Sequence, residues 1–167
     1  MNTVLALIDF SDVSSRVLDH AKSLAKAFDS EVVLMHVVPP EPLVVDFEPP
    51  AVPPDVFDAR QKELSIMRND LIEQGVHASA EVHGGPLQET LLEQIGSIDP
   101  DVIVMGSHGH GSLYHLIVGS VTEGIIRNAQ RPVVIIPSVP APQMRAVKVT
   151  QAEAPAEDVG LGVPLPA

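Results

Sequence analysis

The chain has no cysteine and very few aromatic residues. Phenylalanine, tyrosine and tryptophan together make up 3% of its 167 residues. The absence of cysteine excludes disulfides and thiolate chemistry and fits a cytoplasmic protein, which is the location that we expect. Because aromatic side chains are scarce, valine, isoleucine, leucine and alanine must fill the core, as is usual for a parallel sheet covered on both faces.

Long apolar runs and basic residues are also missing. No run of 18 apolar residues occurs, so we expect no membrane span. The amino-terminal segment, MNTVLALIDFSD, has neither a basic region nor a cleavage site, so we do not expect a secretory signal. The 10 Lys and Arg residues against 22 Asp and Glu give a formal net charge of −12. This balance argues against a broad nucleic-acid-binding surface, because phosphate backbones require clustered cations.

Short apolar runs alternate along the chain with segments of helical periodicity. We expect strands at 3–8, 31–38, 76–83, 102–105 and 133–136, and helices at 13–28, 55–74, 86–95 and from 119 onward. Seven prolines between residues 39 and 54 indicate a long loop. The alternation predicts an α/β fold with a parallel, doubly wound sheet and right-handed crossovers.

The last thirty residues have a different composition from the rest. Residues 138–167 are dominated by proline, alanine and valine with scattered charge. We therefore divide the chain into one domain, 1–137, and a tail, 138–167, that we expect to be mostly disordered. The alternative is that residues 144–150 form an added strand, which covers the sheet edge or reaches a partner subunit.

Glycines and hydroxyl residues follow the fourth apolar run at a regular spacing. Gly106 and Gly109 come directly after it, and Gly119 and Ser120 begin the next helical segment. Glycines let backbone N–H groups approach an anion closely, and the first N–H groups of a helix carry the positive end of its dipole. Ser120 and Thr122 add hydroxyl donors. The spacing predicts a phosphate-binding site at the carboxyl end of a strand, although the glycines could instead only relieve a crowded turn.

These residues resemble the universal stress protein family, in its nucleotide-binding branch. The family pattern Gly-x2-Gly-x9-Gly-Ser/Thr is met at Gly106, Gly109, Gly119 and Ser120. Further matching segments are LIDFSD (7–12), LMHVV (34–38), HGGP (83–86), VMGSHG (104–109), GSVTE (119–123) and RPVVII (131–136). The resemblance covers residues 1–137 in the right order, so it is far more specific than a glycine motif alone.

The resemblance implies a fold and a ligand. The fold is adenine nucleotide alpha hydrolase-like, with a five-stranded parallel sheet of order 3-2-1-4-5 and helices on both faces. The ligand crevice then lies between the first and fourth strands, where the strand order reverses. The ligand is ATP, with Mg²⁺ bound through its phosphates, and two copies pair their last strands in a homodimer. The residues expected to bind the nucleotide are Ile8, Asp9, Val37, Met105, Gly106, His108, Gly109, Gly119, Ser120, Val121 and Thr122.

Asp9 has two possible roles, and some positions near the phosphate site depart from the family pattern. Asp9 either caps the first helix and orders its loop, or contacts the ligand directly. Relatives often carry Arg or Lys in the loop that holds His110 and His115 here, and a Lys is frequent where Gly124 stands. Fewer fixed positive charges favour Mg²⁺ as the counter-charge. The histidines lack the helical register that zinc sites use, so we expect no metal held by protein side chains.

The sequence gives little support for catalysis. No activated nucleophile is paired with a base, and no acidic cluster is spaced to hold two metals. We therefore expect no catalytic residues and predict a nucleotide-dependent regulatory homodimer, read by an unidentified partner protein. The alternatives are a slow ATP hydrolase or phosphotransferase, and a structural stress dimer whose pocket stays empty.

Overall fold

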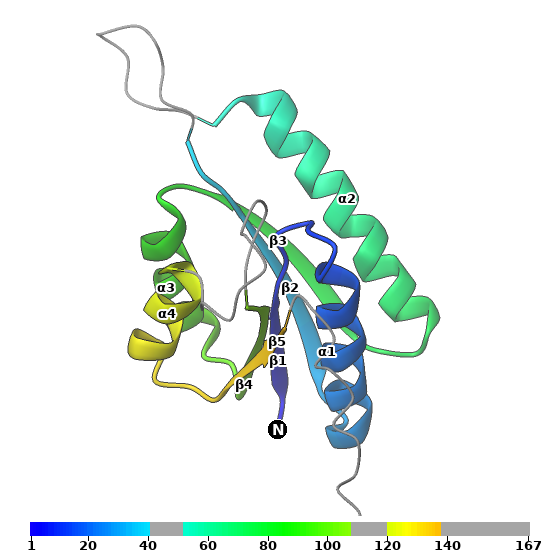
Figure 1. Ribbon diagram of the computed structural model, residues 1–167. Coiled ribbons are helices and arrows are strands. Elements are labelled where there is room, and N and C mark those ends of the chain that lie inside the picture. The colour runs from blue at the N-terminus through cyan, green and yellow to red at the C-terminus, as the bar shows by residue number, and fades with distance from the viewer. Residues whose placement is uncertain (41–51, 108–119, 138–167) are drawn as a thin grey trace, which may run out of the picture.

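Five parallel strands form one sheet through the middle of the molecule (Figure 1). The structure is a computed structural model that describes residues 1–40, 52–107 and 120–137. The strands are β1 (Thr3–Leu7), β2 (Glu31–Val38), β3 (Ala78–Gly84), β4 (Val102–Gly106) and β5 (Val133–Ile136). Their order is β3-β2-β1-β4-β5, and every pairing is parallel. The expected fold class and strand order are confirmed.

Helices cover both faces of the sheet. α1 (Ser14–Phe28) and α2 (Pro54–Glu73) lie on one face, and α3 (Leu87–Ile98) and α4 (Ser120–Asn128) lie on the other (Figure 1). Pro86 was expected to open α3 but instead precedes it, with extended backbone at ψ 120°. None of the helices in these ranges is long and apolar enough to cross a membrane. The tail 138–167, its possible strand at 144–150 and most of the proline-rich loop lie outside the described residues.

The sheet separates two apolar cores because successive side chains of a strand point to opposite faces. On β2, Val32 and Leu34 pack under α1 and α2, whereas Val33, Met35 and Val37 pack under α3 and α4. The other strands alternate in the same way. The strands are therefore apolar on both sides, and aliphatic side chains supply nearly all of the packing, as the composition predicted.

β3 begins two residues later than predicted, and the reason is a helix end. Gly75 has a left-handed backbone (φ 79°), and its N–H donates to the carbonyl of Ile72. The N–H of Val76 donates to the carbonyl of Leu71 at 3.0 Å. These two bonds form a Schellman motif, in which the residue after the glycine packs back onto the helix. Val76 is thus buried as part of the end of α2 and not as the first residue of a strand.

A glycine in α4 allows the two helices on its face to approach each other. A Cβ atom at Gly124 would lie 2.5–2.8 Å from the side-chain amide of Gln88, on α3. Glycine lowers helix stability by about 1 kcal/mol relative to alanine. At this position it also provides the space into which the Gln88 side chain extends.

Gly85 fixes the start of α3. Its N–H donates to the carbonyl of Val38, at the end of β2, and its backbone has φ 150°. A Cβ atom there would lie 2.4 Å from Oγ1 of Thr90, a buried residue of α3. Both the backbone conformation and the close contact therefore require glycine.

We predict that Gly85→Ala destabilises the protein by roughly 1–3 kcal/mol, the usual cost of a strained backbone position. Gly96→Ala is the matched control, because Gly96 is exposed within α3 and no atom lies within 4 Å of its Cβ position. That variant should gain about 1 kcal/mol from helix propensity. Urea unfolding followed by circular dichroism measures both, and equal stabilities of the two variants would contradict the role given to Gly85.

Candidate functional site

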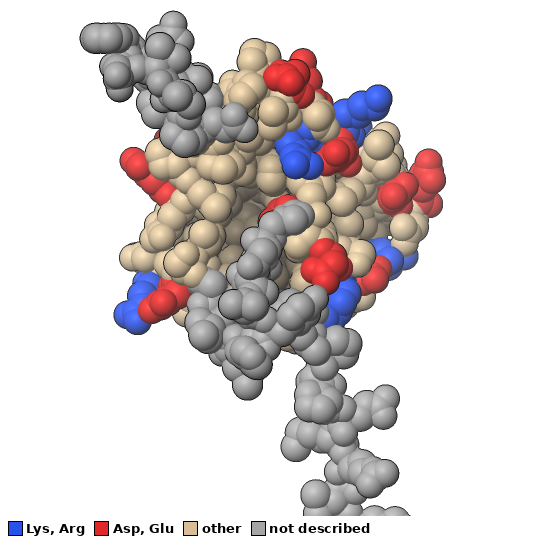
Figure 2. Space-filling model, turned by 45° about the horizontal axis from the view of Figure 1, so that its top comes forward, with Lys and Arg blue, Asp and Glu red and all other residues tan. Residues whose placement is uncertain are grey.

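A cavity of about 470 Å³ opens where β1, β2 and β4 end, on the face covered by α3 and α4. Figure 2 looks onto this end of the molecule and shows a hollow whose visible walls are mostly uncharged. Its lining residues are Leu7, Ile8, Asp9, Met35, His36, Val37, Pro39, Leu87, Leu91, Met105, Gly106, Val121 and Thr122. The cavity lies at the strand-order reversal between β1 and β4, the position at which doubly wound sheets bind ligands.

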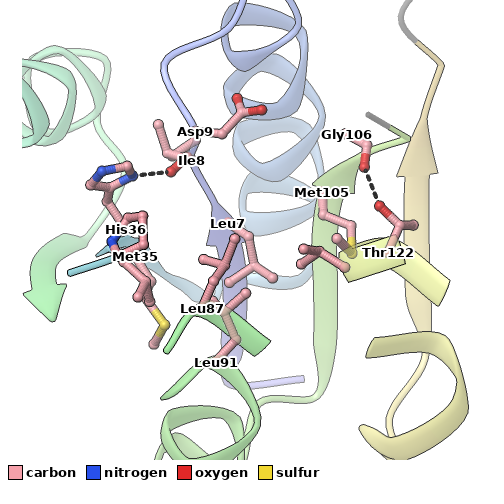
Figure 3. A pocket seen from close by; sticks show the side chains of 13 residues that line it. Leu7, Ile8, Asp9, Met35, His36, Leu87, Leu91, Met105, Gly106 and Thr122 are labelled. Carbon is pink, nitrogen blue, oxygen red and sulfur yellow. Dashed lines mark hydrogen bonds between the residues drawn. The ribbon is translucent and has the colours of Figure 1, made fainter. Parts of the chain in front are cut away.

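The floor of the cavity continues the core beneath α3 and α4. Leu7, Met35, Val37, Leu91 and Met105 belong to both (Figure 3). A pocket of this size with apolar walls and a few polar groups at its rim is typical of small-molecule sites. It suits a flat, largely apolar group that carries polar atoms on its edge.

The backbone borders the cavity where β1 and β2 separate. The two strands pair as far as Leu7 and Met35, and the N–H of Ile8 then donates to the carbonyl of Met35 at 2.8 Å. β2 continues to Val38. Ile8 and Val37, which lie beyond the last residues that pair β1 with β2, both line the cavity.

His36 lies at this separation and holds one backbone group. Its Nδ1 is 2.7 Å from the carbonyl oxygen of Ile8 (Figure 3), and its ring meets that of Phe10 edge-on, with centroids 4.7 Å apart. Burial lowers the pKa of His36, and the positive charge of Arg60 lowers it further. The hydrogen bond to Ile8 and the carboxylates of Asp9 and Glu63 act in the opposite direction.

Asp9 orders the loop between β1 and α1. Its Oδ1 accepts hydrogen bonds from the N–H of Ser11 at 3.0 Å, from Oγ of Ser11 at 2.7 Å and from Oγ of Ser14 at 3.0 Å. The N-cap of α1 is Val13, which makes no side-chain cap. Of the two structural roles expected for Asp9, it therefore performs loop ordering and not helix capping, and it also lines the cavity.

Thr122 connects α4 to the end of β4. Its Oγ1 donates to the carbonyls of Gly106 and Ser107, at 3.3 Å from each, and the residue is only 3% exposed. A buried hydroxyl needs an acceptor, and these carbonyls provide it. The hydroxyl is thus engaged by the backbone, and its contact with a ligand stays a prediction.

The structure brings together most of the residues that the sequence selected. Seven of them line the one cavity, namely Ile8, Asp9, Val37, Met105, Gly106, Val121 and Thr122. Ser120 is exposed at the first position of α4 and does not line it. His108, Gly109 and Gly119, together with His110 and His115, lie outside the described residues.

Six lining residues were missed by the sequence analysis: Leu7, Met35, His36, Pro39, Leu87 and Leu91. Strand alternation could have found one of them, because Met35 has the same parity as Val37. Leu87 and Leu91 line the cavity because of how α3 packs, and no local sequence pattern predicts this packing.

Cationic side chains are absent from the described lining. Asp9 is its one charged residue at neutral pH, and the sequence has no Lys or Arg between positions 69 and 126. Within the described ranges, no group of three His, Cys, Asp or Glu side chains is placed to hold a metal ion. The described lining therefore offers an anionic ligand backbone and hydroxyl groups but no cationic side chain.

Comparison with known proteins gives consistent matches. The profile described as the universal stress protein family matches residues 1–137. Universal stress protein MJ0531 of Methanocaldococcus jannaschii is 31% identical over 131 residues, which cover 77% of each chain. The structure of MJ0577 of the same organism aligns with a TM-score of 0.66 and 21% identity, over 84% of this chain and 98% of that one. A universal stress protein of Archaeoglobus fulgidus, solved in complex with dAMP, aligns with a TM-score of 0.58 and 22% identity, over 81% and 96% of the two chains.

Proposed function

The chain belongs to the universal stress protein family, and on that premise we propose that its cavity binds an adenine nucleotide, namely ATP with Mg²⁺. The observation that carries the proposal is the convergence of seven sequence-selected residues on one cavity at the reversal of strand order. The dAMP complex of the Archaeoglobus protein, which has the same fold, supports an adenine nucleotide as the ligand class.

The base fits the apolar end of the cavity. Met35, Leu91 and Met105 offer apolar surface for its faces, and the main chain of Ile8 and Val37 offers polar atoms for its edge. The ribose lies toward Gly106 and Val121.

The phosphates lie toward the amino end of α4. That helix begins at Ser120, so its first N–H groups and its dipole favour an anion there. The loop residues His108, Gly109 and Gly119 complete the phosphate contacts in this proposal. Bound Mg²⁺ supplies the counter-charge that the cation-poor lining lacks, through the phosphates and not through protein side chains.

We propose a regulatory output rather than turnover. Ser11 and Ser14 donate their hydroxyls to the carboxylate of Asp9, which orders the loop after β1, and we assign neither serine a catalytic role. A nucleotide that contacts the loop after β4 changes the adjoining surface, which an unidentified protein partner then recognises.

We expect isothermal titration calorimetry to show ATP binding in the presence of Mg²⁺. Leu87→Trp should weaken it at least tenfold, because the larger side chain enters the cavity that Leu87 lines. Ile72→Trp is the matched control, since Ile72 is 51% exposed on α2 and should leave affinity unchanged. Absence of binding to ATP, ADP, AMP and cyclic AMP by the unmodified protein would show that the site is not a nucleotide site.

The histidines of the loop should make phosphate binding depend on pH. Between pH 8 and pH 6 imidazoles gain positive charge, so the affinity for ATP at constant Mg²⁺ should rise severalfold. The variant with His108, His110 and His115 all replaced by Gln controls for titration of ATP itself, which is the same in both experiments. A wild-type profile no steeper than that of the variant would remove the histidines from the phosphate site.

We also propose that the protein forms a homodimer through β5. Within the described residues β5 pairs only with β4, and Val133, Val134 and Ile135 are half-buried in the single chain. An apolar edge strand left unpaired invites pairing with another chain.

Sedimentation equilibrium should therefore report a dimer for the wild-type protein. Val134→Lys should shift it to monomer, because a charged side chain then lies at the edge that two copies share. Ser79→Lys places the same charge on β3, the opposite edge of the sheet, and should leave the dimer intact. A wild-type monomer, or a dimer lost only in the Ser79 variant, would contradict pairing through β5.

A further inference from the structure

We propose that His36 is a positioning residue for the base end of the cavity, because it fixes the Ile8 carbonyl that meets an amino group on the ligand. The inference rests on the proposed nucleotide site and names the feature of the ligand that this end reads. His36 acts through Ile8 in this account and need not touch the ligand itself.

The first step concerns the Ile8 carbonyl. Ile8 is 3% exposed and follows the last residue of β1. Two residues later Phe10 takes a left-handed conformation (φ 59°), which turns the chain away from the sheet toward α1. A buried carbonyl that leaves a strand ladder needs another donor, and Nδ1 of His36 supplies it at 2.7 Å.

The second step fixes the tautomer of His36. A carbonyl oxygen only accepts hydrogen bonds, so Nδ1 must carry the hydrogen, and Nε2 of the neutral ring carries none. The oxygen has two lone pairs, and the bond to His36 uses one. The other lone pair can accept from a donor on a ligand in the cavity that Ile8 lines, such as the exocyclic amino group of a 6-aminopurine.

The third step is that the imidazole ring is itself held in place. Phe10 packs against it edge-on at an interplanar angle of 66°, and the guanidinium of Arg60 lies over the Phe10 ring, 5.0 Å from its centroid. Nη1 of Arg60 donates to Glu63 at 2.7 Å. A continuous chain of contacts thus runs from α2 to the backbone of the cavity.

Burial of the ring favours its neutral form, while the charges around it act in both directions. Arg60 and Glu63 face it from α2, and Asp9 faces it from the loop after β1. Burial and Arg60 hold its pKa below the ordinary value of 6.5. Stability that depends on neutral His36 is therefore fully present above pH 6.5 and declines as the pH falls through the lowered pKa.

The experiment uses adenosine as its probe, because adenosine has the amino group but no phosphate for the loop histidines to contact. His36→Phe keeps a ring but removes the donor, and it should weaken adenosine binding roughly three- to tenfold, the value of one hydrogen bond. It should also reduce the preference for adenosine over inosine, which has an oxo group in place of the amino group. His36→Asn places an amide donor near the position of Nδ1 and should recover much of both properties.

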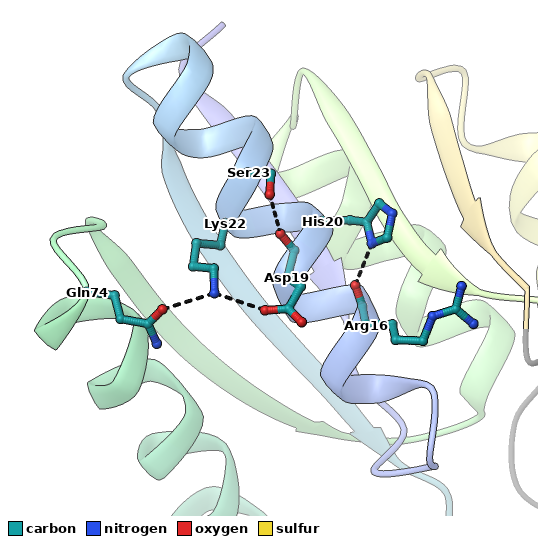
Figure 4. Close-up of polar contacts among 6 residues, drawn as sticks. All are labelled: Arg16, Asp19, His20, Lys22, Ser23 and Gln74. Atoms are coloured by element: carbon teal, nitrogen blue, oxygen red, sulfur yellow. Dashed lines mark hydrogen bonds and ion pairs between the residues drawn. The ribbon is translucent and has the colours of Figure 1, made fainter. Parts of the chain in front are cut away.

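His20 provides a matched control. Its Nδ1 is also paired with a backbone carbonyl, that of Arg16, at 2.8 Å, but it lies exposed on α1 away from the cavity (Figure 4). His20→Phe should change neither adenosine affinity nor the preference over inosine. Nitrogen NMR of the free wild-type protein should show the Nδ1-protonated tautomer for His36 and a pKa for it below the ordinary value of 6.5.

The outcomes distinguish the role of His36 from the nucleotide site on which it rests. If wild-type protein binds adenosine and ATP but His36→Phe matches it in affinity and in preference over inosine, the role of His36 is wrong and the nucleotide site stands. If wild-type protein binds neither ligand, the nucleotide site is wrong, and this role fails with it. An Nε2-protonated tautomer of His36 in the free protein would overturn the positioning role on its own.

Discussion

The structure depends on one constraint, the divergence of the chain on either side of β1. From β1 the connections through α1 and α2 run over one face of the sheet to β2 and β3, and those through α3 and α4 run over the other face to β4 and β5. Because neighbouring connections leave on opposite faces, none of the described helices begins directly above the end of β1 on the side of α3 and α4. The cavity occupies that space, and Asp9 after β1 and Gly106 at the end of β4 line it.

Most of this architecture could be predicted from the sequence, because each element has a local signal. β2 lies between a buried serine and two prolines, and its bounds match the prediction at both ends. The errors occurred where the same sequence feature can belong to either of two structures. Val76 is apolar and precedes a strand, but its burial belongs to the Schellman motif that ends α2. The strand order came from family resemblance, since alternation alone does not specify which strands become neighbours.

The site was predicted unevenly for the same reason. The end that we propose for the phosphates has a local signal, glycines at fixed spacing before a helix, so Gly106 and Thr122 could be selected from the sequence. The apolar end is assembled from several elements, and Leu87 and Leu91 reach it only because Gly85 sets where α3 begins. His36 was read as part of an apolar strand. Its contacts depend on Phe10, an aromatic residue in a left-handed conformation, which no local rule would predict.

In the proposed site, the two ends of the cavity respond to pH in opposite directions, because Lys and Arg are scarce in this part of the sequence. At the base end a neutral imidazole is kept neutral by burial and by Arg60, so acidification acts against the arrangement that holds the Ile8 carbonyl. At the phosphate end the side chains available in the loop are histidines, which acquire charge under the same conditions. Acidification should therefore weaken the binding of the base and strengthen the binding of the phosphates. The affinity for a whole nucleotide reflects both effects, whereas a ligand with only a base or only a phosphate shows one of them. A lysine in the loop would remove the effect of pH on phosphate binding, because its charge does not change between pH 8 and pH 6. In the proposed nucleotide site, histidines in place of lysine or arginine would therefore give phosphate binding a dependence on pH that a basic loop would lack.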